Sequence, residues 1–206
     1  RQSFNQFWSQ LSLDPLALKN KYFRHAADLA HAHLDSLTRD HTFEHGAVIA
    51  APSNYSRNQL AVLLGIIKQC SFSAVGLVDL ALLQANTAQA DDCIIIDLQL
   101  HQALLTSFRK RDGHLVKENV VQVPASGLLA LHDAWSNMIA DEFIKQSRFD
   151  PQHNAETEQY VYNQLGPWLN QSQIQNELLL EINQQGTVHQ ARIARENFEQ
   201  RSRSIF

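Results

Sequence analysis

The sequence has no apolar run that approaches the roughly 20 residues a membrane-spanning helix needs. It also has no excess of positive charge, because 21 acidic residues outnumber 17 lysines and arginines and give a formal net charge of -4. A basic surface field that would attract nucleic acid or anionic lipid is therefore not expected. These two absences argue against a membrane or a nucleic acid as a partner.

Cysteine is scarce as well. The two cysteines, Cys70 and Cys93, both lie in apolar surroundings, and their spacing matches no metal-binding motif. We interpret them as buried free thiols, which persist in a reducing compartment. This pattern favours a cytoplasmic protein.

Several common catalytic signatures are missing too. The sequence contains no G-x-S-x-G, no P-loop and no G-x-G-x-x-G. The segment His41–His45 formally matches H-x-x-E-H, a zinc-peptidase pattern whose ligands must share one helix face. Gly46 follows at once and begins an apolar strand, so we interpret the segment as a polar connector in a loop.

The most informative stretch that is present runs over Asp91–Leu115. A β-branched apolar run, Cys93–Ile96, is followed by Asp97, by alternating residues over Leu98–Phe108 and by a polar turn. This pattern predicts a buried strand, a tight turn, a second strand and a hairpin into a third. A carboxylate at the carboxyl end of a buried strand, as at Asp97, is a common place for ligand chemistry, and the alternative is a turn cap.

The residues before this stretch predict a β-α-β-α order, which is typical of a parallel sheet with crossover helices. A preceding helix is expected within Phe4–Leu37, with Pro15 at its first position. The four later elements are expected over Gly46–Ala51, Leu60–Ile67 after a Ser56 cap, Ala74–Val78 and Leu80–Ala88. The 206 residues suffice for two small lobes, and a polar linker places them at residues 1–90 and 91–206.

The residues after this stretch predict a further mixed region. A strand, two helices, a hairpin and a closing helix are expected over Val116–Val123, Leu128–Phe143, Glu156–Leu169, Leu178–Ile193 and Ala194–Arg201. Gly166 and Pro167 should kink or end the second of these helices. Residues 148–206 are expected to form a smaller α+β subdomain of the second lobe.

Four segments, in this order, resemble a known family. They read G-A-V-I-A-A-P-S-N-Y-S-R-N-Q-L from Gly46, G-L-V-D-L-A from Gly76, I-I-I-D-L from Ile94 and A-R-I-A-R-E-N-F-E from Ala191. Together they resemble the ATPase domain of the 70-kDa heat-shock chaperones, within the actin and sugar-kinase superfamily. The resemblance implies an α/β, actin-like ATPase (ribonuclease H-like) fold, present in part, with a small α+β insertion.

The resemblance also implies a nucleotide site, with ATP and magnesium as the family's cofactors. In the family, the strand that ends in Asp is followed by Gly-Gly-Gly-Thr, whose backbone amides cradle phosphates. Here Asp97 and Leu98 are followed by Q-L-H-Q, so the cradle cannot form in the usual way. Asp97 and Gln99 are the candidate residues for binding a nucleotide or a cation at this position.

A third candidate is Asp79. The family's Asn-Glu-Pro-Thr supplies a carboxylate near the magnesium and the attacking water, and the matching segment is Leu77–Leu80, with Asp79 one place off. The two interpretations of Asp79 are a water-activating group and an ordinary helix cap. The segment that matches the adenosine-contacting helix, Asn163–Asn170, keeps none of the family's charged residues.

Three ATP-binding elements thus depart from the family together, which favours a binding or regulatory module that keeps the scaffold without hydrolysis. The alternatives are an active ATPase whose missing loops lie outside the chain and an actin-type assembly protein. The start at Arg1 favours a fragment of a longer protein, although processing would give the same start. The expected partner is another protein or the remaining lobe of the same protein.

Overall fold

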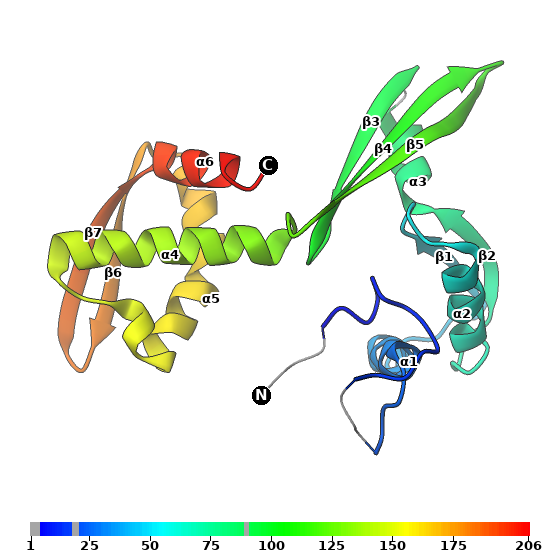
Figure 1. Ribbon diagram of the computed structural model, residues 1–206, viewed down its shortest axis with the longest axis horizontal. Helices are drawn as coiled ribbons and strands as arrows, with labels where there is room; N and C mark the ends of the chain where they lie inside the picture. Colours follow the sequence, from blue (N-terminus) through cyan, green and yellow to red (C-terminus); the bar gives the residue numbers. More distant parts are fainter. Residues whose placement is uncertain (1–4, 18–20, 89–90) are drawn as a thin grey trace. The chain divides into compact units, whose positions relative to one another are not determined.

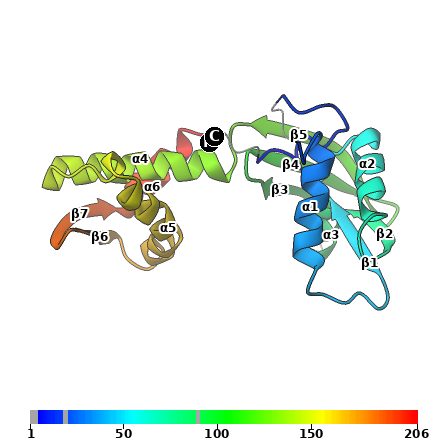
Figure 2. The same ribbon diagram turned by 90° about the horizontal axis from the view of Figure 1, so that it is seen from below.

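The computed structural model describes residues 5–17, 21–88 and 91–206, which form helices and strands in a mixed α/β arrangement (Figures 1 and 2). This confirms the predicted α/β class. The chain divides into two compact units, one made of Arg1–Asp97 and Leu104–Gln122, the other of Leu98–Ala103 and Val123–Phe206. The predicted lobes, residues 1–90 and 91–206, stay a prediction, and residues 89 and 90 lie outside the described ranges.

The helices and strands of the first part of the chain follow the predicted order. They are α1 (Ala26–Thr38), β1 (Ala47–Ala51), α2 (Arg57–Ile67), β2 (Ala74–Asp79), α3 (Leu80–Ala88), β3 (Asp92–Leu98), β4 (Gln102–Arg111) and β5 (His114–Pro124). Strands β1 and β2 run parallel, with Ala51 opposite Asp79. The predicted β-α-β-α order is confirmed, and the carboxyl ends of the two parallel strands lie side by side.

Helix α1 is shorter than predicted, because it begins at Ala26 rather than near the start of the range Phe4–Leu37. The carboxylate of Asp28 accepts hydrogen bonds from the amides of Arg24 at 2.7 Å and His25 at 3.1 Å. These amides lie at the start of the helix and have no partner within it, so the carboxylate stabilises a start at this point.

The chain before α1 folds back on itself instead of continuing the helix. Pro15 forms an isolated antiparallel bridge with His25, so the prediction that Pro15 begins a helix was wrong. The amide of Ala27 donates a hydrogen bond to the carbonyl oxygen of Ser12 at 3.3 Å, which ties this returning chain to the first helical turn. Phe4 and residues 18–20 of the predicted helix lie outside the described residues.

Helices α1 and α2 pack against each other beside β1 and β2 and enclose an apolar core (Figure 2). Helix α2 begins after Ser56, as predicted, because the Ser56 hydroxyl accepts a hydrogen bond from the amide of Gln59 at 3.2 Å. The buried members of this core are Leu11, Ala27, Ala30, Ala51, Leu63, Ile66, Ile67 and Phe72.

Strands β3, β4 and β5 form a separate sheet in that order, and α3 packs on one of its faces. The predicted burial of β3 applies to one face only, because Ile94 and Ile96 on the other face are 63% and 68% exposed. Cys93 and Ile95 alternate with them and pack toward α3. Both cysteines are free and only half-buried, so the predicted complete burial of their thiols was also wrong.

The second unit is a two-layer arrangement of helices on a hairpin. Its elements are α4 (Leu128–Ser147), the 3₁₀ turn η1 (Pro151–His153), α5 (Ala155–Ser172), β6 (Glu177–Gln184), β7 (Thr187–Ala194) and α6 (Arg195–Arg203). Helices α4 and α5 pack on one face of the antiparallel pair β6–β7 (Figure 1). Leu178, Leu180 and Ile182 of β6 are fully buried on that face, which confirms the predicted hairpin.

Helix α5 runs through Gly166 and Pro167 to Ser172, so of the two predicted outcomes, a kink or an end, these residues do not end the helix. Proline inside a helix removes one backbone hydrogen bond. Leu165 and Trp168, on either side of the pair, are both buried in the core, and this packing holds the helix together across the proline.

Candidate functional site

The candidate site lies at the carboxyl ends of the parallel strands β1 and β2. Ser53 follows β1, and Asp79 is the last residue of β2. A cavity of about 260 Å³ is open at this point, and Ser53, Tyr55, Asp79 and Lys117 are among its lining residues. The parallel register of the two strands therefore places polar side chains from separate loops around one cavity.

The Asp79 carboxylate accepts hydrogen bonds from side chains and from the backbone. The Ser53 hydroxyl donates to Oδ1 at 2.5 Å, and the Lys117 ammonium donates to Oδ2 at 2.6 Å. The amides of Ala81 and Leu82 donate to Oδ1 at 3.0 Å and 3.4 Å. Asp79 therefore caps the start of α3 and forms an ion pair with β5 at the same time.

The environment of Asp79 favours its ionised form. Burial by itself acts to raise the pKa of this carboxyl, but the hydrogen bonds from Lys117 and Ser53 outweigh it and hold the pKa below its usual range. The Asp79 side chain is 19% exposed and that of Lys117 is 40% exposed. The charge of the carboxylate is thus compensated from within the first unit.

Tyr55 contributes a neutral hydroxyl to the same cavity. Its phenol donates a hydrogen bond to the carbonyl oxygen of Trp8 at 2.7 Å, and burial raises its pKa to about 12. Tyr55 therefore stays protonated at neutral pH and acts as a fixed packing residue, not as a base.

The other two predicted residues lie near the end of β3. Asp97 is half-buried in the penultimate position of β3, and Gln99 follows the strand in a turn. The amide of Gln99 donates to the carbonyl oxygen of Gln102 at 2.9 Å, and the Gln102 side chain donates to the Gln99 side-chain oxygen at 2.7 Å. The turn is therefore closed by hydrogen bonds between its own first and last residues.

This turn also caps helix α4. The amide of Leu128 donates to the carbonyl oxygen of Gln99 at 2.9 Å, and the amide of Leu129 donates to that of Leu100 at 3.0 Å. Helix N-terminal amides of this kind can bind an anion when they are free. Here two of these amides, those of Leu128 and Leu129, already donate hydrogen bonds to carbonyl oxygens of the turn.

Gly127 permits this close packing. A Cβ atom built on Gly127 would lie 2.4 Å from the backbone nitrogen of Gln102 and 2.6 Å from the carbonyl oxygen of Gln99. Backbone atoms at these distances cannot accommodate a side chain, so the residue at the N-cap of α4 must be glycine for the turn to lie where it does.

The structure joins Asp79 to two residues that were not predicted, Ser53 and Lys117. Ser53 could have been found from its place directly after an apolar strand, where polar ligand-binding groups are common. No local sequence pattern links Lys117 to Asp79, because Lys117 lies 38 residues further along the chain on a strand of another sheet. The predicted adenosine-helix match, Asn163–Asn170, forms part of α5, whose Leu165 is fully buried.

The segment His41–His45 lies in an irregular loop, as predicted. Across residues 5–17, 21–88 and 91–206, no three His, Cys, Asp or Glu side chains gather closely enough to hold a metal ion. In the same ranges, no helix combines the length and apolar character needed to cross a membrane.

The fold and the site define a mixed α/β protein with a lysine-paired carboxylate at the carboxyl ends of two parallel strands. No protein-family model matches the chain. A search of curated proteins likewise gave no significant match.

Proposed function

We propose that this chain is a divergent heat-shock-chaperone-like protein of the actin-like ATPase fold, which acts as a binding or regulatory module and does not hydrolyse ATP. The parallel β-α-β-α arrangement and the motif resemblance support the fold. The observation that carries the loss of hydrolysis is the ion pair between Asp79 and Lys117.

A magnesium ion needs carboxylate oxygens and water in near-octahedral positions. Lys117 lies 2.6 Å from Oδ2 of Asp79, and the Ser53 hydroxyl and the amides of Ala81 and Leu82 point to Oδ1. A cation at Asp79 would have to displace the lysine or lie beside its positive charge. Both are unfavourable, so Asp79 acts as a structural group in this proposal.

The turn after β3 supports the same conclusion. Gln99 and Gln102 hydrogen-bond to each other, and the carbonyl oxygens of Gln99 and Leu100 accept from the amides at the start of α4. A phosphate group requires amide donors at such a turn, whereas carbonyl oxygens repel it. In the proposed module the fold is therefore retained, and the turn that would bind phosphate in the heat-shock family packs against the start of α4 instead.

The tests are calorimetric titration of the full chain with magnesium ATP, measurement of phosphate release, and measurement of the melting temperature with and without magnesium. We expect no turnover above the buffer rate and no magnesium-dependent rise in melting temperature. Asp97→Asn is the matched variant, and it should behave like the parent in both measurements. Phosphate release with micromolar binding would contradict the proposal, as would a magnesium-dependent rise that is lost in Asp97→Asn. Sedimentation of filaments at high protein concentration would instead favour the assembly alternative.

A further inference from the structure

The β6–β7 hairpin of the second unit has one closed edge. In the described part of the chain its sheet contains two strands, so each strand has an outer edge. The Gln146 side chain of α4 donates a hydrogen bond to the carbonyl oxygen of Arg192 at 2.8 Å and accepts one from the Arg192 amide at 2.8 Å. Both backbone groups of Arg192 therefore point away from β6, and Gln146 occupies the outer edge of β7.

The outer edge of β6 is open. Leu179 lies opposite Arg192 in the antiparallel register. Residue pairs in such a ladder alternate between mutual hydrogen bonding and outward-pointing backbone groups, so Leu179 and Glu181 direct their amides and carbonyls away from β7. These groups have no hydrogen-bond partner among the residues that the structure describes, and Leu179 is 50% exposed. Such an edge can pair with a further strand.

The helix layer on the hairpin leaves room for that strand. Helix α4 packs on β7, and α5 packs on β6. Packed helices lie about 8–10 Å apart, whereas neighbouring strands lie about 4.7–4.9 Å apart, so two helices cover a wider layer than two strands fill. Because Gln146 of α4 closes the β7 side, the extra width lies beside β6, beneath α5.

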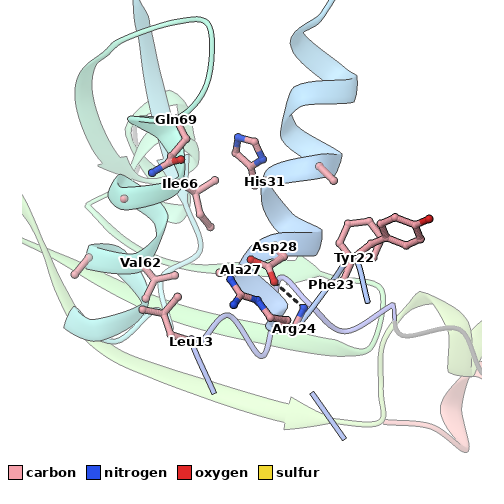
Figure 3. A pocket seen from close by; sticks show the side chains of 13 residues that line it. Leu13, Tyr22, Phe23, Arg24, Ala27, Asp28, His31, Val62, Ile66 and Gln69 are labelled. Atoms are coloured by element: carbon pink, nitrogen blue, oxygen red, sulfur yellow. Dashed lines mark hydrogen bonds between the residues drawn. The ribbon is translucent and has the colours of Figure 1, made fainter. Parts of the chain in front are cut away.

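A cavity of about 200 Å³ opens between the start of α5 and the end of β6, and Glu156, Tyr160 and Ile182 are among its lining residues. Small-molecule pockets typically measure about 300–1,000 Å³, so this cavity suits a single side chain. Glu156 supplies the one charge among the described residues that line it. A larger cavity of about 700 Å³ between α1 and α2 differs, because Arg24 and Asp28 line it with opposite charges (Figure 3).

The surface around the β6 edge is acidic. Residues 149–191 contain five acidic residues and no lysine or arginine. Four of the five lie on α5 and β6, and they are Glu156, Glu158, Glu177 and Glu181. Arg192 of β7 pairs with Glu177 at 3.7 Å, and the other three have no cationic partner in the part of the chain that the structure describes. A surface of one sign favours a partner of the opposite sign.

We propose that the outer edge of β6 binds an extended basic segment of a partner protein, which adds a strand to the hairpin beneath α5. Backbone hydrogen bonds to Leu179 and Glu181 hold the segment, and one of its lysine or arginine side chains enters the cavity beside Glu156. The interaction uses the second unit alone and does not depend on the proposed loss of ATP hydrolysis.

Leu179→Pro blocks the β6 edge. The Leu179 amide points away from β7, so proline removes no hydrogen bond between the two strands, and prolines in sheets occur on such edges. Val188→Pro is the matched control on the other strand. Val188 is 54% exposed and lies opposite Asn183, so by the same alternation its amide points to the outer edge of β7.

The probe is a fluorescein-labelled short peptide of alternating lysine and valine, and its binding to the full chain is measured by fluorescence anisotropy. The parent and Val188→Pro should give a saturable increase in anisotropy, whereas Leu179→Pro should give none. Glu156→Gln should weaken binding about twofold to fivefold, because it removes one ion pair that solvent partly screens. Melting temperatures measured by circular dichroism verify that each variant is folded.

Two further peptides separate strand addition from attraction between charges. Alternating lysine and proline keeps the charge but cannot form a ladder, and alternating glutamate and valine forms strands with the opposite charge. Neither should bind the parent. The proposal is overturned if the lysine–proline or the glutamate–valine peptide binds as tightly as the lysine–valine peptide, if the latter gives no saturable increase, or if folded Leu179→Pro binds it as the parent does. The peptide comparison on the parent decides the question even where a variant does not fold.

Discussion

At the scale of single residues, Asp79 is the most informative position. It ends β2, caps α3 through the amides of Ala81 and Leu82, and pairs with Lys117. The two roles use different properties of the side chain, since capping needs an acceptor oxygen and pairing needs a negative charge. Two substitutions separate these roles.

We expect Asp79→Ala to lower the free energy of unfolding by about 1–2 kcal/mol, because it removes the cap as well as the ion pair. Asp79→Asn keeps an acceptor oxygen for the amides and loses only the charge. Its cost should stay below about 1 kcal/mol, because Lys117 is 40% exposed and solvent screens the pair. Urea unfolding of both variants measures the difference. Equal losses in the two variants would show that the ion pair, not the cap, dominates.

The lowered pKa of Asp79 also makes the stability of the protein depend on pH. A carboxyl group whose pKa is lower in the folded state contributes stability that is fully present above its unfolded pKa, here 3.8. That contribution is lost as the pH falls through the lowered folded value. The urea concentration at the unfolding midpoint of the parent should therefore decrease as the pH is lowered below about 4.

In Asp79→Asn this acid-induced fall should be smaller than in the parent, because one of the responsible groups no longer titrates. Asp28 and Glu142 also have lowered pKa values and remain in the variant, so part of the fall should persist. Identical pH profiles for the parent and Asp79→Asn would show that Asp79 has the same pKa in the folded and unfolded protein.

At the scale of elements, the contact between the Gln99–Gln102 turn and the start of α4 connects a strand end to a helix end. The carbonyl oxygens of the turn accept hydrogen bonds from the amides of Leu128 and Leu129, which have no partners within the helix. Gly127 has an extended backbone conformation that any residue can adopt. The requirement for glycine therefore comes from the close approach of the turn alone.

Gly127→Ala tests this contact. The added Cβ atom would meet backbone atoms of the turn at 2.4–2.6 Å, so the turn or the helix must move. We expect a loss of about 1–3 kcal/mol in the free energy of unfolding, as in other overpacked positions. Gly65→Ala serves as the control in thermal or urea unfolding, because open space surrounds Gly65 and alanine should stabilise its helix. A Gly127→Ala protein as stable as the parent would contradict the close contact.

At the scale of the whole molecule, the chain contains separate cores. One lies between α1, α2 and β1, another lies under α3, and a third lies between the β6–β7 hairpin and its helices. The three segments that match ATP-binding elements of the heat-shock family lie at the ends of β2 and β3 and within α5. Under the proposed function, a packing or pairing interaction in each segment takes the place of a ligand-binding one, and this is why we expect no ATP turnover.

Much of the secondary structure could be predicted because its signals are local. Ser56 predicted the start of α2, and Asn183–Gly186 predicted the turn between β6 and β7, where Gln185 and Gly186 adopt positive φ. The failures occurred where distant chain segments decide the outcome. Helix α1 starts late because the returning chain near Ser12 packs on its first turn, and α5 continues through Pro167 because the neighbouring residues are buried in the core.

The candidate site divides in the same way. Asp97 could be selected from the sequence because a polar residue at the end of an apolar run is visible there, whereas Asp79 and Gln99 were selected through the resemblance to the heat-shock ATPase motifs. Lys117 could not be selected, since an ion pair depends on which faces of the fold meet. Such a pairing leaves no periodic signal in the sequence.

The sequence by itself determined which segments become most of the strands and helices and where α2 begins, because backbone propensity, capping and the spacing of apolar side chains act over a few residues. Only the tertiary structure decided that Ile94 and Ile96 are exposed, that Lys117 neutralises Asp79 and that the Gln99 turn packs against Gly127. Burial, charge compensation and close backbone contact are properties of pairs of segments far apart in the chain, so they are fixed only when those segments pack together.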